Sequence, residues 1–178
     1  MKKLSHEEIS YKRASIEKLD NIKRMPVYVL LNSIRSCYNV GSIFRTSDGV
    51  MIEKLFLCGY TPTPEKKEVI KTALGSQNSV NWEYIKDPIK VITSLKSNGI
   101  KVCALELTDK SISYCAVSKS DFPLCLIVGN EISGVSQELI ELCDFSIEIP
   151  QYGIKQSLNV AVAYGVAVFD LRRVFETK

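Results

Sequence analysis

The run Val27-Tyr28-Val29-Leu30-Leu31 decides the fold class, because it is apolar at nearly every position. A strand with one solvated face alternates apolar and polar residues, whereas a strand buried on both faces is almost continuously apolar. Leu124-Cys125-Leu126-Ile127-Val128 has the same character and is the most apolar strand candidate in the chain. Two such strands predict a mostly parallel sheet that helices cover on both faces.

Extended and helical patterns alternate along the chain on either side of these two runs. Further strands are expected at residues 54–58, 80–84, 100–107 and 146–149. Helices are expected at residues 38–48, 65–74, 88–97, 135–143 and 157–173, the first of them closed by Gly49. Residues 61–64 read Thr-Pro-Thr-Pro and predict an extended loop. This order of elements predicts a single α/β domain.

The N-terminal segment carries the whole positive excess of the chain. Residues 1–25 hold seven Lys and Arg against four Asp and Glu, whereas residues 26–178 hold sixteen of each. Ser5-x-x-Glu8 is a capping box, and a thin apolar stripe follows it, so an amphipathic helix is expected to end before Pro26. We interpret residues 1–25 as a basic helix that belongs to the same domain as residues 26–178. Lys12 and Arg13 are its candidate RNA contacts, although such a face often contacts only solvent.

The composition is that of an ordinary globular protein. The 178 residues are 46% hydrophobic and 24% charged. No apolar run reaches the roughly eighteen residues of a membrane span, and no apolar signal core follows the first residues. The six cysteines form no C-x-x-C pair and His6 is the single histidine, so we expect neither disulfides nor a metal site. These features predict a cytoplasmic protein with no membrane partner.

Polar loops follow the predicted strands at the sheet edge where parallel sheets bind ligands. The segment from Ile149 to Asn159 leads into the last helix, whose start could bind an anion or simply be capped by Ser157 or Asn159. Gly129-Asn130-Glu131 permits close approach of a ligand and places a carboxylate at the rim, which could equally balance a helix dipole. No G-x-G-x-x-G or G-x-x-x-x-G-K-[ST] motif occurs, so nicotinamide chemistry and nucleotide hydrolysis are disfavoured.

A third group of polar residues lies on the helix predicted at 38–48. Asn39, Ser42 and Arg45 share one face, while the positions between them are spaced to face the sheet. A guanidinium beside an amide suits a phosphate, which it binds through charge-assisted hydrogen bonds. A capped surface helix with a solvated arginine is an equally good interpretation of this segment alone.

These three segments resemble the three motifs of the SpoU (TrmH-like) RNA 2′-O-methyltransferases of the SPOUT superfamily. The matching stretches are Asn39-x-Gly41-x-Ile43-x-Arg45, Gly129-Asn130-Glu131-x-x-Gly134, and Ile149-Pro150 through Ser157-Leu158-Asn159-Val160. They occur in order over roughly residues 27–173. The resemblance implies a SPOUT fold with a deep C-terminal trefoil knot, an obligate homodimer, and S-adenosylmethionine held by the knot loops. Its product would be a 2′-O-methylated ribose in tRNA or rRNA.

The resemblance also implies roles for individual residues. The motif positions associated with catalysis are Arg45, Asn39, Glu131, Ser157 and Asn159. The positions that would bind the cofactor are Leu105, Glu106, Gly129, Ile149, Ser157 and Leu158, and those that would contact RNA are Arg35, Arg45, Lys12 and Arg13. Arg45 would act as a base after losing its proton or would bind the adjacent phosphate and favour the alkoxide, and Glu131 is an alternative proton acceptor.

Two other functions remain open at this point. The chain could be an RNA-binding protein that keeps the fold without turnover, or a methyltransferase that modifies a base. The presence of Arg45, Glu131, Ser157 and Asn159 argues against the first, and the N-x-G-x-I-x-R motif argues against the second.

Overall fold

A parallel sheet forms the centre of the molecule in the computed structural model, which describes residues 1–11 and 22–177. Within these residues its strands are β1 (Met25–Asn32), β2 (Ile52–Cys58), β3 (Trp82–Tyr84), β4 (Lys101–Leu105), β5 (Ile112–Ser113), β6 (Leu124–Val128) and β7 (Phe145–Glu148). The strands lie in the order β3-β2-β1-β6-β4-β7-β5, and every neighbouring pair is parallel. The predicted α/β class is therefore confirmed, with the two apolar runs as adjacent strands.

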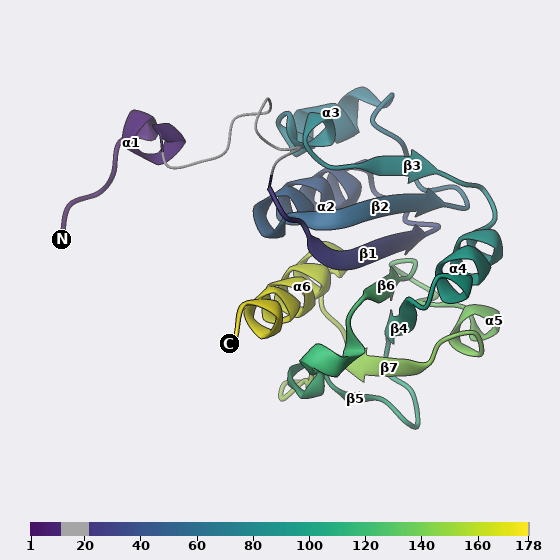
Figure 1. Ribbon diagram of the computed structural model, residues 1–178. Coiled ribbons are helices and arrows are strands. Elements are labelled where there is room, and N and C mark those ends of the chain that lie inside the picture. Colours follow the sequence, from purple (N-terminus) through teal and green to yellow (C-terminus); the bar gives the residue numbers. More distant parts are fainter. Residues whose placement is uncertain (12–21, 178) are drawn as a thin grey trace.

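Helices cover both faces of the sheet. The helices that pack on it are α2 (Cys37–Val50), α3 (Lys67–Ala73), α4 (Pro88–Ser97), α5 (Gln137–Ile140) and α6 (Val160–Glu176), and short 3-10 turns occur at Ser76–Asn78, Tyr114–Ala116 and Lys119–Asp121. Helices α2, α3 and α6 lie on one face, and α4 and α5 lie on the other (Figure 1). Side chains of β1 enter both cores, because Val27, Val29 and Leu31 pack with the first group of helices and Leu30 packs with the second.

The capping box at the N-terminus is present. Helix α1 (His6–Tyr11) begins after Ser5, whose hydroxyl accepts from the Glu8 N–H at 3.2 Å. The Glu8 carboxylate in turn accepts from the Ser5 N–H at 2.7 Å. Helix α1 buries none of its residues. Residues 12–21, with Lys12 and Arg13, lie outside the described part of the chain. The expectation that the helix continues up to Pro26 is wrong, because residues 22–24 are not helical and Met25 already begins β1.

Several predicted boundaries differ from the observed ones. Helix α2 does not end at Gly49 but continues to Val50, and Met51 takes the left-handed conformation with φ 51°. Helix α5 spans only four residues of the predicted 135–143. The chain leaves the helix early because it must reach the edge of β4, where the Asp144 N–H donates to the Val102 carbonyl at 2.8 Å. Strand β4 ends at Leu105 rather than at 107, which leaves the following residues free to line a cavity.

Candidate active site

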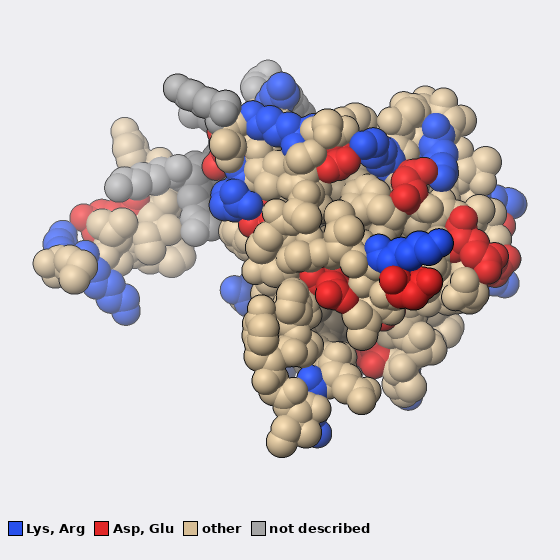
Figure 2. Space-filling model, turned by 90° about the horizontal axis from the view of Figure 1, so that it is seen from below, with Lys and Arg blue, Asp and Glu red and all other residues tan. Residues whose placement is uncertain are grey.

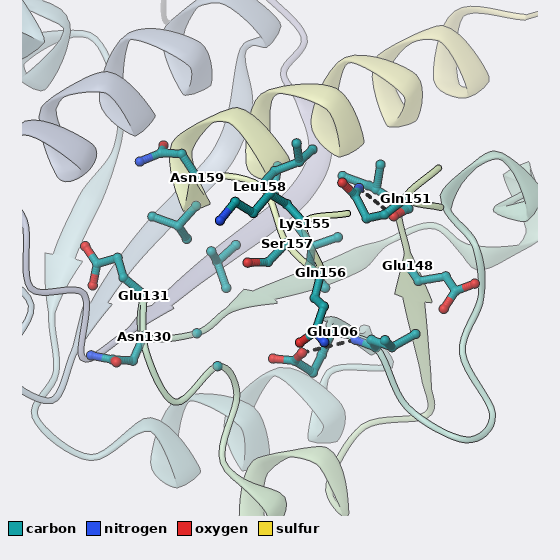
Figure 3. A pocket seen from close by; sticks show the side chains of 18 of the residues that line it. Glu106, Asn130, Glu131, Glu148, Gln151, Lys155, Gln156, Ser157, Leu158 and Asn159 are labelled. Atoms are coloured by element: carbon teal, nitrogen blue, oxygen red, sulfur yellow. Dashed lines mark hydrogen bonds between the residues drawn. The ribbon is translucent and has the colours of Figure 1, made fainter. Parts of the chain in front are cut away.

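A cavity of about 880 Å³ opens at the carboxyl ends of β4, β6 and β7. Its wall consists of residues 105–107, 128–134, 147–151 and 153–160, together with Ala163 (Figure 3). This position follows the general rule for ligand sites in parallel sheets, and the volume lies within the range typical of small-molecule sites. The two loops that the sequence singled out after β6 and β7 meet here with the loop after β4. The loop after β1 is not part of this wall.

Gly129 is the point where the loop after β6 folds back on its own strand. A Cβ at this position would lie 2.2 Å from the Gly134 carbonyl carbon and 2.3 Å from the Val135 nitrogen. The loop is closed by two hydrogen bonds, from Asn130 N–H to the Gly134 carbonyl at 3.0 Å and from Gly134 N–H to the Asn130 carbonyl at 2.9 Å. Glu106, the residue after β4, stabilises the loop, because its Oε2 accepts from Val135 N–H at 2.8 Å. Only glycine fits this cradle.

Asn130 joins three loops at the sheet edge. Its Nδ2 donates to the Ser33 carbonyl and to the Tyr60 hydroxyl, both at 2.7 Å, and these partners follow β1 and β2. Its Oδ1 accepts from the N–H groups of Ile132 at 2.8 Å and Ser133 at 3.1 Å. The side chain is 9% exposed, so its hydrogen-bonding capacity is satisfied inside the protein. Asn130 belongs to the second sequence motif, but the sequence pattern indicated no specific role for it. Its position directly after the glycine that ends a strand was the only indication of a role in this loop.

Glu131 links the loop after β6 to the start of α2. Its Oε2 accepts from the Arg35 N–H at 2.8 Å, and its Oε1 accepts from the Ser36 N–H at 3.0 Å and from Asn39 Nδ2 at 2.8 Å. The Asn39 Oδ1 then accepts from Asn159 Nδ2 at 3.1 Å. One hydrogen-bonded chain thus connects residues of all three sequence motifs. The carboxylate lies at the N-terminal end of α2, not at the helix that follows Glu131 in sequence, so the expected dipole partner is wrong.

The surroundings of Glu131 favour its ionised form. Partial burial raises the pKa of this carboxyl, but the hydrogen bonds from Arg35, Ser36 and Asn39 outweigh that effect and hold the pKa below its usual value. A carboxylate that already accepts three hydrogen bonds and has a lowered pKa is a weak proton acceptor. The geometry therefore favours a positioning role for Glu131.

Replacing Glu131 with Gln is expected to destabilise the protein by about 1–2 kcal/mol at neutral pH, or roughly 2–8 °C in Tm. The Gln amide nitrogen would face one or more of the N–H donors of Arg35, Ser36 and Asn39, which now donate to a carboxylate oxygen. Because the folded pKa is depressed, the stabilisation is present above the unfolded pKa of about 4.5 and is lost as pH falls through the folded value. The Tm gap between wild type and variant should therefore narrow below about pH 4.5 in thermal melts. A gap independent of pH, or an equal one for the exposed Glu138→Gln, would contradict this assignment.

Helix α6 begins later than the sequence predicted. Its N-cap is Asn159, whose Oδ1 accepts from the N–H groups of Ala161 at 3.0 Å and Val162 at 3.4 Å. The expected start at Ser157 is wrong, because residues 149–159 form an irregular loop over the cavity. Two of the first helical N–H groups are thus already bonded within the protein, which favours capping over anion binding at this helix start.

The predicted site residues within the described part of the chain separate into three groups. Those that line the cavity are Leu105, Glu106, Gly129, Glu131, Ile149, Ser157, Leu158 and Asn159. Asn39 lies behind them and joins the wall through its two hydrogen bonds. Arg45 and Arg35 are exposed and are not part of the wall, and none of the six ion pairs within residues 1–11 and 22–177 involves either of them. Ser36 caps α2 and Arg45 is exposed, which agrees with either of the two sequence interpretations of this segment.

The surface charges (Figure 2) and the potential metal ligands of the described residues do not point to a particular ligand. On the face shown in Figure 2, acidic and basic side chains are interspersed, and no single basic surface stands out. Among the residues that the structure describes, no group of three or more His, Cys, Asp or Glu could hold a metal ion. No helix in the described ranges is long and apolar enough to cross a membrane.

Comparison with known proteins gives consistent matches. A sequence profile of the SpoU rRNA methylase family matches residues 26–169. The tRNA (guanosine(18)-2′-O)-methyltransferase of Aquifex aeolicus is 32% identical over 159 residues, which cover 88% of this chain and 73% of that protein. The Escherichia coli K12 protein of the same name is 28% identical over 152 residues, covering 85% of this chain and 65% of its own length. The chain thus spans about two thirds of the length of the Escherichia coli relative.

Solved structures show the same similarity. The crystal structure of the A. aeolicus TrmH/SpoU tRNA modifying enzyme aligns with a TM-score of 0.79 and 29% identity, over 89% of this chain and 81% of that one. The AdoMet-bound rRNA methyltransferase from Sinorhizobium meliloti aligns with a TM-score of 0.79 and 30% identity, over 87% of this chain and 59% of that one.

Proposed function

This chain belongs to the SpoU rRNA methylase family, and from that premise we propose that it transfers a methyl group from S-adenosylmethionine to a ribose 2′-hydroxyl of tRNA or rRNA. The observation that carries the proposal is the hydrogen-bonded chain of Glu131, Asn39 and Asn159, which brings the three motif segments together at one cavity. The names of the relatives, which act on guanosine ribose in tRNA or rRNA, support the same reaction.

The cavity residues fit S-adenosylmethionine. The six proposed cofactor residues all lie on the wall, where Ile149 and Leu158 would pack on the adenine and the Glu106 carboxylate could accept from ribose hydroxyls. Gly129 leaves the backbone accessible where a side chain could not fit. When bound, S-adenosylmethionine supplies a methyl group already activated on a sulfonium. The protein must then orient the ribose hydroxyl in line with that methyl group.

The proposed division of labour follows from the surroundings of each group. Glu131 and Asn39 hold the starts of α2 and the loop after β6 in fixed positions, and Asn159 does the same for α6. Arg45 is exposed and takes part in none of the ion pairs between described residues. It would bind the phosphate next to the reacting ribose and stabilise the developing alkoxide. Arg35 is the second candidate RNA contact of the described chain, and Lys12 and Arg13 remain proposals from the sequence.

We also propose that the active form is a homodimer with the C-terminal trefoil knot of SPOUT proteins. The outer face of α6 supports the dimer, since Val162, Val166 and Phe169 are 53%, 37% and 55% exposed at helical spacing. The insertion of β6 between β1 and β4 and the return of α6 onto α2 are compatible with the knot. We propose that residues 1–25 belong to the same domain as residues 26–178. We also propose a cytoplasmic location, which the six free cysteines support.

The proposed reaction can be tested by incubating the protein with total RNA and S-adenosylmethionine labelled on the methyl group. We expect label in RNA, and after alkaline hydrolysis we expect it in dinucleotides, because a 2′-O-methyl group protects the adjacent linkage. Heat-denatured protein is the control. Label recovered in mononucleotides would place the methyl group on a base, and absence of transfer to any RNA would indicate a binding protein without turnover.

A further inference from the structure

The cavity wall carries an unusual set of charges. Its acidic side chains are Glu106, Glu131 and Glu148, and its single basic side chain is Lys155. Each carboxylate already accepts a hydrogen bond within the protein, from Val135 N–H, from the start of α2 and from the Ser111 hydroxyl respectively. Lys155 differs from them, because among the described residues its exposed ammonium group makes neither a hydrogen bond nor an ion pair.

The loop from Ile149 to Asn159 places Lys155 over the cavity. Figure 3 shows its side chain extending above the pocket toward the side that holds Glu131 and Asn159. That side is where the three motif segments meet, whereas Ile149 and Leu158 supply the apolar part of the wall. A ligand whose apolar ring packs on Leu158 would therefore direct its polar tail toward Lys155.

We propose that Lys155 binds the carboxylate of the methionine moiety of S-adenosylmethionine and so selects ligands that carry an amino-acid tail. This inference rests on the function proposed above. The ligand has two positive groups, the sulfonium and the ammonium, and one carboxylate, which matches a wall with an excess of acidic groups and one cation. The same acidic excess disfavours an RNA phosphate as the partner of Lys155, since the polyanion would approach three carboxylates.

Calorimetric titration of the Lys155→Met variant with three probes tests the assignment. S-adenosylmethionine and S-adenosylhomocysteine have the carboxylate, and 5′-methylthioadenosine lacks the whole amino-acid tail. We expect the Kd of the first two to rise by about tenfold, as for the loss of one charge-assisted hydrogen bond, and the Kd of 5′-methylthioadenosine to stay within about twofold. Lys155→Arg should retain binding of all three probes, because it keeps the cation.

Each other outcome identifies a specific error. Equal weakening of all three probes would mean that Lys155 shapes the loop rather than binding the carboxylate, and unchanged binding of all three would exclude any contact. A raised KM for RNA with unchanged Kd for S-adenosylmethionine would assign Lys155 to RNA phosphate. Failure of the wild type to bind any probe would instead overturn the proposed function. Lys90→Met, the same change at an exposed position on α4, is the matched control and should alter no affinity.

Discussion

Replacing Arg45 with Ala is expected to lower kcat for RNA methylation by about 10²- to 10³-fold. Arg45 is exposed on α2, takes part in none of the ion pairs of the described chain and lies outside the cavity wall. Its loss should therefore leave Tm and the Kd of S-adenosylmethionine unchanged. Single-turnover rates at saturating cofactor, together with thermal melts, measure the two effects separately.

The Arg45→Lys variant distinguishes a specific guanidinium from a simple positive charge. Lysine keeps the charge but cannot form the planar, bidentate contact with a phosphate, so we expect most of the loss to persist. The matched control is Lys71→Ala, which removes an exposed cation from α3 and should leave turnover unchanged. Near-normal turnover of Arg45→Lys would exclude both proposed roles of Arg45, as base and as phosphate ligand.

The fold class could be predicted from the sequence because burial on both faces leaves a direct pattern. Every residue from Val27 to Leu31 except Tyr28 is fully buried, and β6 is buried throughout. The alternation of elements then determined that the sheet is parallel. Strand order could not be obtained this way, since β6 enters between β1 and β4 although many residues separate them along the chain. Adjacency of that kind depends on the path of the whole chain.

The wall of the site could be predicted, but the way it is held together could not. A cavity lies at the loops where the sequence predicted a site, at the carboxyl ends of strands, and Gly129 is required there because a Cβ would clash with Gly134 and Val135. The partners of Glu131 come from the start of α2, more than ninety residues earlier. Likewise, a Cβ at Gly41 would lie 2.6 Å from Thr72 Cβ on α3, a contact invisible in the motif. Contacts between residues so far apart along the chain could not be predicted from the motifs, because they depend on how the whole chain folds.

Small residues of the last helix pack against other parts of the same chain. Ala167 is buried in the core, and a Cβ at Gly165 would lie 4.0 Å from Thr46 on α2, so both positions pack within the chain. The face of α6 that carries Val162, Val166 and Phe169 is apolar and exposed. The sequence could not separate these two sets of positions, because both satisfy the same helical spacing.

A charge on this outer face of α6 is expected to break the proposed homodimer. Val166 is 37% exposed between Val162 and Phe169, so Val166→Glu should fold normally as a monomer. In a symmetric dimer the same change occurs on both sides of the interface, and an unpaired buried charge costs about 3–5 kcal/mol. The dimer Kd should therefore rise by at least about 10²-fold. Sedimentation velocity over a concentration series measures this shift directly.

The control is Ile70→Glu. Ile70 is 43% exposed and belongs to α3, so the added charge does not lie on the α6 surface. It carries the same change in charge and a similar starting exposure, so it tests whether the position on α6 matters. An Ile70→Glu variant that dissociates as readily as Val166→Glu would mean that added charge alone disfavours association. A wild type that sediments as a monomer would overturn the dimer, and the stripe of Val162, Val166 and Phe169 would then need another apolar partner.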